Sequence, residues 1–297
     1  MLKHPGQLKV RVGIAALIVV IGVVTAIALN SGSASSQWTA ACSSAPTEAG
    51  DKPESAVTEA REALLSKGKD PRLELELVDL DACAVRLSWK ADQPQPTASV
   101  VKLLIALDLI DRSGLPEGSE ATDLHTMLAA SDDHIASRLW LQDGGPAIVQ
   151  RQAKKLGLTH TSPPADTGQW GSTRMSPADV ITVYRHITAE LPEDERDFIT
   201  EAMESAPRNA ADGFDQHFGI PRAFPGADWA VKQGWGSSDG RRVLNTTGLV
   251  RTGSRTFALA VMATWDDSID WATATTALTA ATSTLKSRLT AGGSLLR

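Results

Sequence analysis

Ser99 and Lys102 stand three residues apart, just ahead of an almost wholly apolar run at 103–110. Residues at this spacing share one face of a helix, so the lysine amine would lie beside the serine hydroxyl. An amine in that place can take the hydroxyl proton and convert a weak alcohol into a nucleophile. Prolines break the chain upstream, and Thr97 is predicted to cap the helix. Ser99 would then occupy the first turn, where free backbone N–H groups stabilise an oxyanion.

Two further segments carry the polar groups that this chemistry needs. The first is Ser131-Asp132-Asp133, in a turn between two expected helices, and the second is Lys232-Gln233-Gly234, at the end of an expected strand. If both segments meet Ser99, a second hydroxyl and a second ammonium group surround the nucleophile. Simpler roles stay open, because Ser131 can cap the following helix and Lys232 can be an exposed strand end.

Hydrophobic periodicity predicts the elements that must position these segments. The expected helices cover 54–67, a stretch from 99, 123–130, 135–141, 146–156, a stretch from 177, 193–205 and 269–289. The expected strands cover 72–78, 82–89, 229–232, 243–250 and 257–264. Strands at both ends of this order predict an α+β fold, with an antiparallel sheet flanked by helices and an inserted all-helical subdomain. A cleft between the two parts is the natural place for a site.

The first fifty residues do not have the pattern of a globular domain. Residues 1–11 are basic and read as a cytoplasmic tail, and the apolar run 12–29 would span about 27 Å as a helix, close to the thickness of a bilayer core. This run is either a transmembrane signal anchor or a cleaved signal peptide, and its length favours the anchor. Residues 30–52 are rich in small residues and predict a flexible linker, which leaves 53–297 as one domain.

The chain has two cysteines, Cys42 and Cys83. Outside the membrane an even pair indicates a disulfide, which would tie the linker to the start of the domain. The alternative is lipid attachment at Cys42. Thr39-Ala40-Ala41-Cys42 matches a lipidation signal poorly, because a threonine stands where a large aliphatic residue is usual, and the disulfide is therefore favoured.

The net charge of −6 and the lack of a basic stripe beyond the N-terminal flank give no support to nucleic-acid binding. No cysteine–histidine spacing indicates a metal site, and we expect neither a metal nor an organic cofactor. The expected partners are a small-molecule or peptidoglycan-like substrate with a carboxylate, and the membrane through the N-terminal segment.

With three motifs in this order, the chain resembles the class A β-lactamases and, more broadly, the penicillin-recognising serine hydrolases. The resemblance extends from about residue 53 to the C-terminus. It includes the stretch 123–139 around the second motif and Gly144-Gly145-Pro146 ahead of a helix that stops at Gly157. It implies a β-lactamase/transpeptidase-like form of the α+β fold.

The resemblance also implies a role for each motif residue. Ser99 would be the acylated nucleophile, and Lys102 its proton acceptor or a charge that lowers its pKa. Ser131 would relay a proton to the leaving nitrogen, and Lys232 would supply positive charge that attracts a substrate carboxylate. The N–H groups of Ser99 and Trp235 would form the oxyanion hole.

The substrate-binding positions implied in the same way are Asp133, Gln233, Gly234, Trp235, Arg241 and Arg242. The two arginines would help to hold the substrate carboxylate, although they follow a hairpin turn and solvation is the simpler role. Two positions depart from the family pattern. Asp133 replaces an asparagine and could repel an anionic substrate, and Gln233 replaces a compact hydroxyl with a longer amide.

The loop between Gly157 and Pro177 departs further, because in class A enzymes it holds a glutamate that activates the deacylating water. Here no glutamate occurs between Glu120 and Glu190, and Asp166, the only acid of the loop, reads as a turn former. Loss of a general base costs about 10²–10⁴ in rate. Acylation could then proceed through Lys102 while hydrolysis of the ester stalls.

We therefore expect an extracytoplasmic, membrane-tethered serine hydrolase of the β-lactamase or penicillin-binding type. It would act through an acyl-enzyme on Ser99 and would be a poor β-lactamase. The alternative is a catalytically inactive cell-envelope binding module on the same fold. The missing glutamate and the residues Asp133 and Gln233 favour the module, whereas the retained serines and lysines of the three motifs argue against it.

Overall fold

The computed structural model describes residues 38–48 and 54–289. The chain divides into two compact units, 1–34 and 35–297, and every described residue belongs to the second. The predicted basic tail and the apolar run 12–29 lie outside the described residues. Within 38–48 and 54–289, no helix has the length and apolar character needed to cross a bilayer.

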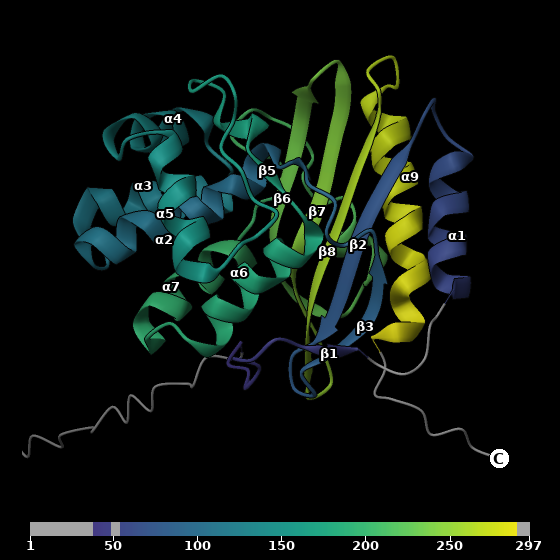
Figure 1. Ribbon diagram of the computed structural model, residues 1–297, viewed down its shortest axis with the longest axis horizontal. Coiled ribbons are helices and arrows are strands. Elements are labelled where there is room, and N and C mark those ends of the chain that lie inside the picture. The colour runs from purple at the N-terminus through teal and green to yellow at the C-terminus, as the bar shows by residue number, and fades with distance from the viewer. Residues whose placement is uncertain (1–37, 49–53, 290–297) are drawn as a thin grey trace, which may run out of the picture. The chain divides into compact units, whose positions relative to one another are not determined.

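A six-stranded sheet forms the centre of the second unit (Figure 1). Its spatial order is β1 (Thr47–Glu48), β3 (Ala84–Trp89), β2 (Arg72–Asp79), β8 (Arg255–Asp266), β7 (Arg241–Thr252) and β6 (Asp228–Ser238). All neighbours are antiparallel except β1 and β3, which run parallel. The pairing of β2 with β8 joins the two ends of the domain, and the predicted α+β class with an antiparallel sheet is confirmed.

Helices cover both faces of this sheet. In Figure 1 the pair α1 (Glu54–Leu65) and α9 (Trp271–Ser283) lies against one face, and the longer helices between β3 and β6 gather on the opposite side. These others are α2 (Lys102–Ser113), α3 (Gly118–Ala129), α4 (Asp133–Gln142), α5 (Pro146–Leu156), α6 (Pro177–Ala189) and α7 (Glu193–Glu204). Each face of the sheet has its own hydrophobic core, because side chains alternate between the two faces along a strand. On β2 the leucines at 73, 75 and 77 belong to the core beneath α1 and α9, whereas Val78 belongs to the core on the other face.

Several element boundaries differ from the sequence expectation. α3 begins at Gly118 rather than at 123, and the last helix ends at Ser283 and continues as a 3₁₀ segment, Thr284–Arg288. The three C-terminal strands are longer than predicted at both ends. The pattern also missed the short α8 (Ile220–Ala223) and a two-stranded ladder of β4 (Gln95–Pro96) with β5 (Arg174–Met175). These pieces are too short to generate a periodic signal.

The predicted flexible linker is wrong for residues 38–48, which pack on the domain as a strap. Trp38 and Cys42 are each only 1% exposed and belong to the core under the helices. The backbone N–H of Ala40 donates to the carbonyl of Thr188 on α6. Arg185 of α6 donates to two strap carbonyls, at 3.1 and 2.8 Å. The small-residue composition predicted flexibility, but the buried Trp38, the hydrogen bonds to α6 and the bond at Cys42 together hold the segment on the domain.

A disulfide joins Cys42 of the strap to Cys83 at the start of β3, which confirms the favoured pairing. It lies beside the parallel pairing of β1 with β3, where Thr47 sits opposite Ala84. The strap is therefore fixed to the sheet by a covalent bond as well as by backbone hydrogen bonds.

Glu74 on β2 gives the domain a pH-dependent stability. It is 2% exposed, and its Oε2 accepts no hydrogen bond from any described residue. Burial raises its pKa from 4.5 to about 7, so the folded state holds an extra proton between these values. The stability that Glu74 contributes is therefore fully present below pH 4.5 and is lost as the pH rises from 4.5 through 7, by about 3 kcal/mol in total.

Glu74→Gln is expected to remove this loss. Glu76, also on β2, has its pKa raised to about 7 by burial and contributes a similar loss. Urea unfolding at about pH 5 and about pH 8 should therefore show a difference in the free energy of unfolding that is about half as large in the variant as in the wild type. Glu59→Gln, on the exposed face of α1, is the control and should keep the wild-type difference. An equal pH dependence in Glu74→Gln and the wild type would count against the assignment.

Candidate active site

Ser99 stands in a 3₁₀ turn, Ala98–Val101, that runs directly into α2. The residue before it, Ala98, has a φ of 45°, so the chain turns sharply just ahead of Ser99. Thr97 occupies the position before the turn, but its side chain makes no capping hydrogen bond, and the predicted cap is wrong. Its backbone carbonyl instead accepts from the side-chain amide of Asn245 on β7, at 3.0 Å.

The amine of Lys102 lies at the centre of the candidate site. Its Nζ is 2.8 Å from the hydroxyl of Ser99, 2.7 Å from the carbonyl of Ser131, 3.2 Å from the Ser131 hydroxyl and 2.5 Å from Oδ1 of Asp133. The side chain is 0% exposed. Burial lowers the pKa of Lys102, and the Asp133 carboxylate opposes that shift.

Ser131 connects the two lysines of the site. It lies between α3 and α4 with a φ of 57°, a left-handed conformation that is uncommon outside glycine. The helix cap is the neighbouring Asp132, whose Oδ1 accepts the N–H groups of His134 and Ile135 at 2.8 and 3.0 Å. The capping role considered for Ser131 is therefore wrong, and its hydroxyl is available to both amines.

Lys232 reaches the same hydroxyl from the sheet. It lies on β6, is 1% exposed, and its Nζ donates to Ser131 Oγ at 2.9 Å and to the Gln233 carbonyl at 3.3 Å. An exposed strand end is thus excluded. Burial and the nearby Lys102 amine push the pKa of Lys232 well below its usual value, and Asp133 opposes this shift.

β6 approaches the Ser99 turn closely because Gly234 has no side chain. A Cβ at this position would lie 2.5 Å from the carbonyl oxygen of Thr97, closer than real Cβ contacts allow. Gly236, two residues on, has room: its Cβ would lie 3.9 Å from that of Ala98. The two glycines therefore form a matched pair on the same face of one strand.

Gly234→Ala is expected to push β6 away from the nucleophile. Overpacking of this kind costs about 1–3 kcal/mol, and a displacement near 1 Å can slow a positioned reaction by about 10²-fold. Thermal unfolding and the rate of acylation of Ser99 measure the two effects. Gly236→Ala should change neither by much. Equal behaviour of the two variants would contradict the steric argument.

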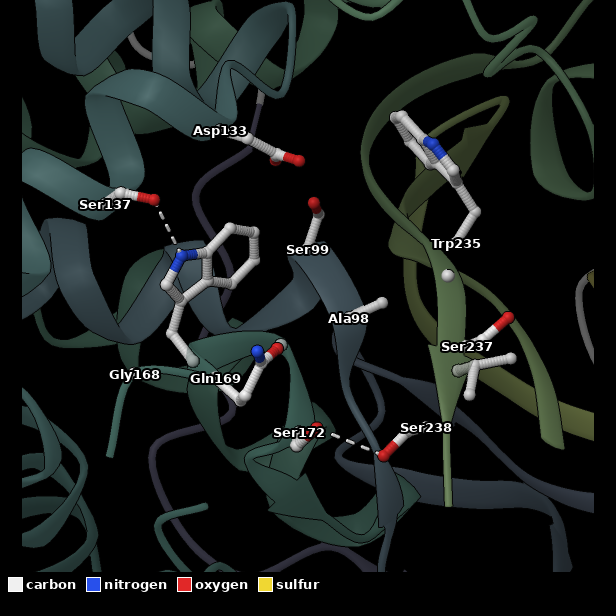
Figure 2. Close-up of a pocket in the computed structure, with 14 residues that line it drawn as sticks. Ala98, Ser99, Asp133, Ser137, Gly168, Gln169, Ser172, Trp235, Ser237 and Ser238 are labelled. Atoms are coloured by element: carbon white, nitrogen blue, oxygen red, sulfur yellow. Dashed lines mark hydrogen bonds between the residues drawn. The ribbon is translucent and has the colours of Figure 1, made fainter. Parts of the chain in front are cut away.

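A pocket of about 350 Å³ opens above Ser99 (Figure 2). In Figure 2 the Ser99 hydroxyl and the Asp133 carboxylate point toward the same space, and Trp235 stands on the opposite rim. The lining residues are Ala98, Ser99, Asp133, Ser137, Gly168, Gln169, Trp170, Gly171, Ser172, Trp235, Gly236, Ser237, Ser238 and Val243. Asp133 is the only charged side chain among them. The Ser99 hydroxyl is therefore reachable from the pocket, with the two lysines buried beneath it.

Three side chains expected to bind substrate do not line this pocket, and neither does Gly234, which packs on Thr97. Gln233 is buried, and its amide nitrogen donates to the carbonyls of Gln216 and Phe218. Successive strand residues face opposite sides of a sheet, so a Lys232 that faces Ser131 turns Gln233 away. Arg241 donates to Asp70 and to Thr264 of β8.

Arg242, the third, lies over the ring of Trp271 at 4.4 Å and donates to the carbonyl of Asp267. Both arginines thus tie the sheet to its own turns and to α9. The expectation that either holds a substrate carboxylate finds no support in this geometry.

The loop between Gly157 and Pro177 supplies pocket residues that the motif search did not single out. The ring centroid of Trp170 lies 4.8 Å from the Lys102 amine, and its indole N–H donates to Ser137, the dashed line that ends at Ser137 in Figure 2. The available signal was a large aromatic residue inside a loop otherwise rich in glycine and serine. Ser172 and Ser238, whose hydroxyls are 3.1 Å apart, join this loop to β6.

Asp166, the one acid of this loop, forms a turn as expected. Its Oδ1 accepts the N–H of Gly168 at 3.0 Å, and the side chain is exposed and outside the pocket lining. No carboxylate of this loop therefore faces Ser99.

Comparison with known proteins places these features in a family. Residues 114–288 match the family described as "Beta-lactamase enzyme family". "Putative lipoprotein LppW" of Mycobacterium tuberculosis (strain ATCC 25618 / H37Rv) and its counterpart in Mycobacterium bovis are each 40% identical over 148 residues, 47% of this chain and 46% of the relative. The chain thus spans about half the length of the curated relatives that it matches.

Solved structures support the same fold. PBP-A is 20% identical with a TM-score of 0.65, over 82% of this chain and 98% of that one. A class A β-lactamase from Mycobacterium abscessus is 19% identical with a TM-score of 0.65, over 78% and 98%. Together with the sequence match over more than half its length, this common architecture shows that the chain belongs to the β-lactamase enzyme family.

Proposed function

We propose that the protein is an extracytoplasmic serine acyl-transfer hydrolase that forms an acyl-enzyme on Ser99. One observation carries the proposal: the Ser99 hydroxyl, the Ser131 hydroxyl and the amines of Lys102 and Lys232 form one hydrogen-bonded cluster below an open pocket. A fold that only binds a ligand has no need of two buried amines on two serine hydroxyls, because burying each amine costs free energy.

In the acylation step, Oγ of Ser99 forms a bond to the carbonyl carbon of an amide or ester while its proton passes to the free amine form of Lys102. The proton moves on through the Ser131 hydroxyl, 3.2 Å away, to the leaving nitrogen or oxygen as its bond to carbon breaks. Lys102 and Ser131 thereby return to their starting states. Lys232 orients the Ser131 hydroxyl by its 2.9 Å hydrogen bond.

The N–H groups of Ser99 and Trp235 are the proposed oxyanion donors. Ser99 lies in the first turn ahead of α2, where backbone donors have no helical partner. Trp235 lies on β6, the last strand of the sheet order, whose outer edge faces the pocket. Donors on these two elements would meet at the carbonyl that Ser99 attacks.

Hydrolysis of the ester is proposed to be slow. The pocket lining contains no carboxylate except Asp133, which is already bound to Lys102 at 2.5 Å. The loop that holds the deacylating base in class A enzymes offers only Asp166, which forms a turn. The acyl-enzyme should therefore persist, and the protein would resemble a penicillin-binding or D-alanyl-peptidase-like enzyme more than an efficient β-lactamase.

The pH dependence of acylation follows from Lys102. The amine accepts a proton only in its neutral form, so acylation rises with pH through the pKa of Lys102, which burial lowers. Asp133→Asn removes the carboxylate that opposes this shift. The rising limb of the acylation rate is therefore expected at lower pH in the variant than in the wild type. A limb that moves to higher pH would contradict Lys102 as the base.

Location is part of the proposal. The apolar run 12–29 would hold the protein at the outer face of the membrane, with 1–11 inside. The disulfide suits an oxidising compartment, and two relatives carry lipoprotein names. Because the sulfur of Cys42 is bonded to Cys83, a lipid on that sulfur is incompatible with the fold described here. The domain then begins at the strap rather than at residue 53.

The test is the intact mass of the protein during exposure to penicillin G. The wild type should gain one penicillin mass, because opening of the β-lactam ring adds the whole molecule, and should lose it slowly after the free drug is removed. Ser99→Ala should gain nothing. Absence of an adduct across a panel of β-lactams, together with no cleavage of D-Ala-D-Ala esters, would refute the proposal.

A second candidate is a binding module for cell-envelope fragments. The ion pair of Lys102 with Asp133 favours it, because this contact holds the amine in its charged form. Such a module would bind a wall fragment equally well in the wild type and in Ser99→Ala, without a covalent adduct.

A further inference from the structure

The pocket wall is negatively charged, whereas an anionic substrate would need a positive charge there. Asp133 is 60% exposed and is the only charged lining residue. Its Oδ1 holds Lys102, whereas Oδ2 accepts no hydrogen bond from the described residues. Figure 2 shows this carboxylate directed into the space above Ser99. One carboxylate oxygen beside the nucleophile is thus free for a ligand.

Positive charge is not presented to the same space. The amines of Lys102 and Lys232 are 0% and 1% exposed, and their hydrogen bonds go to groups of the site itself. Arg241 and Arg242, the nearest arginines along the chain after β6, bind Asp70 and stack on Trp271 instead. A substrate carboxylate would therefore meet no exposed cation among the lining residues.

Two further carboxylates add to the negative field. Asp212 accepts the indole N–H of Trp235 at 2.9 Å on the pocket rim, and Asp132 caps α4 beside Ser131. Both are near enough to raise the pKa of Lys102. Three carboxylates thus lie near the two buried amines, and of these three only that of Asp133 lines the pocket. An ammonium group also suits the aromatic rim formed by Trp235.

We infer that the site selects acyl donors with an ammonium group close to the scissile carbonyl, bound by Oδ2 of Asp133. This inference rests on the proposed function and names its substrate class. Opposite unit charges about 4 Å apart near a protein surface attract each other, and we expect a preference of about tenfold over a neutral analogue. A carboxylate in the same place should be disfavoured by about tenfold.

Three penicillins provide a matched series, because ampicillin, penicillin G and carbenicillin differ only in one substituent of the side chain. That substituent is an amino group, a hydrogen and a carboxylate. At about pH 6 an α-amino group is protonated. Acylation rates of the wild type, followed by intact mass, should fall in the order ampicillin, penicillin G, carbenicillin. In Asp133→Asn the three rates should lie within about twofold of one another.

Asp228→Asn is the control for loss of a carboxylate. Asp228 is 59% exposed and is also paired with a cation, Arg251, but it lies outside the pocket lining. This variant should keep the wild-type order of rates. The ratio of rates within each variant is the readout, so a general change in reactivity of Asp133→Asn does not affect the comparison.

Binding to Ser99→Ala separates this inference from the proposed function, because the variant cannot be acylated. Its affinity for the three penicillins, measured by calorimetry, should follow the same order, and Ser99→Ala/Asp133→Asn should lose that order. Equal rates and affinities for all three would overturn the inference while leaving the acyl-enzyme intact. Ordered affinities without any wild-type adduct would support the charge preference and refute the acyl-transfer function. Neither adduct nor binding would overturn both.

Discussion

Lys102→Met is expected to slow acylation of Ser99 by about 10²–10⁴-fold, the usual cost of losing a general base. Methionine keeps most of the volume of this fully buried side chain but cannot accept the proton of Ser99. It also leaves the Ser131 hydroxyl with Lys232 as its remaining amine partner in the cluster. The initial rate of adduct formation with penicillin G, followed by mass, measures the effect.

Lys155→Met is the matched control for this substitution. Lys155 is a lysine of the helical side that pairs with Asp111 and lies outside the pocket, so its loss should leave acylation unchanged. Circular dichroism of Lys102→Met should match the wild type at the assay temperature. A folded Lys102→Met protein that is acylated at the wild-type rate would remove Lys102 from the mechanism.

Breaking the disulfide is expected to destabilise the domain strongly. Cys42 and Cys83 are 41 residues apart, and closing a loop of that length is worth about 4 kcal/mol in the chain-entropy account. For a domain of this size, Cys83→Ser should lower the melting temperature by roughly 10 °C. Scanning calorimetry with and without reductant measures it.

The reductant provides the internal control. It should lower the melting temperature of the wild type to that of Cys83→Ser and should not change the variant. The double variant Cys42→Ala/Cys83→Ser should resemble the single one, because either change removes the same bond. A fall in the melting temperature of less than about 2 °C would contradict this expectation, because it would mean that the disulfide restricts the unfolded chain very little.

Three residues of the hydrogen-bonded cluster, Ser99, Lys102 and Ser131, could be selected from the sequence because each stands where a helix begins or ends, whereas Lys232 lies inside β6. Proline, glycine and turn residues mark those points, and the apolar run after Lys102 indicates a buried helix. The spacing of Ser99 and Lys102 fixes their contact locally. The meeting of Ser131 with Lys232, 101 residues apart, required the order of strands and helices as well.

The substrate-binding residues were harder to predict, for physical reasons that differ. The orientation of Gln233 away from the pocket follows from the alternation of side chains along a strand, because its neighbour Lys232 faces the site. Arg241 is held by Asp70, which is 171 residues distant, and no local pattern reveals such a partner. Trp170 lies in a loop without periodicity, so only the folded chain brings it against Lys102.

The Cys42–Cys83 bond also determines how mechanical force enters the domain. A pull on the chain ahead of the strap passes through this covalent link into β3 and from there into the sheet. α1 and β2 lie between the two cysteines, so their segment of chain cannot be drawn out end to end while the bond is intact. The segment between the two cysteines would measure about 15 nm if fully extended, and it can extend under force only after the disulfide is reduced.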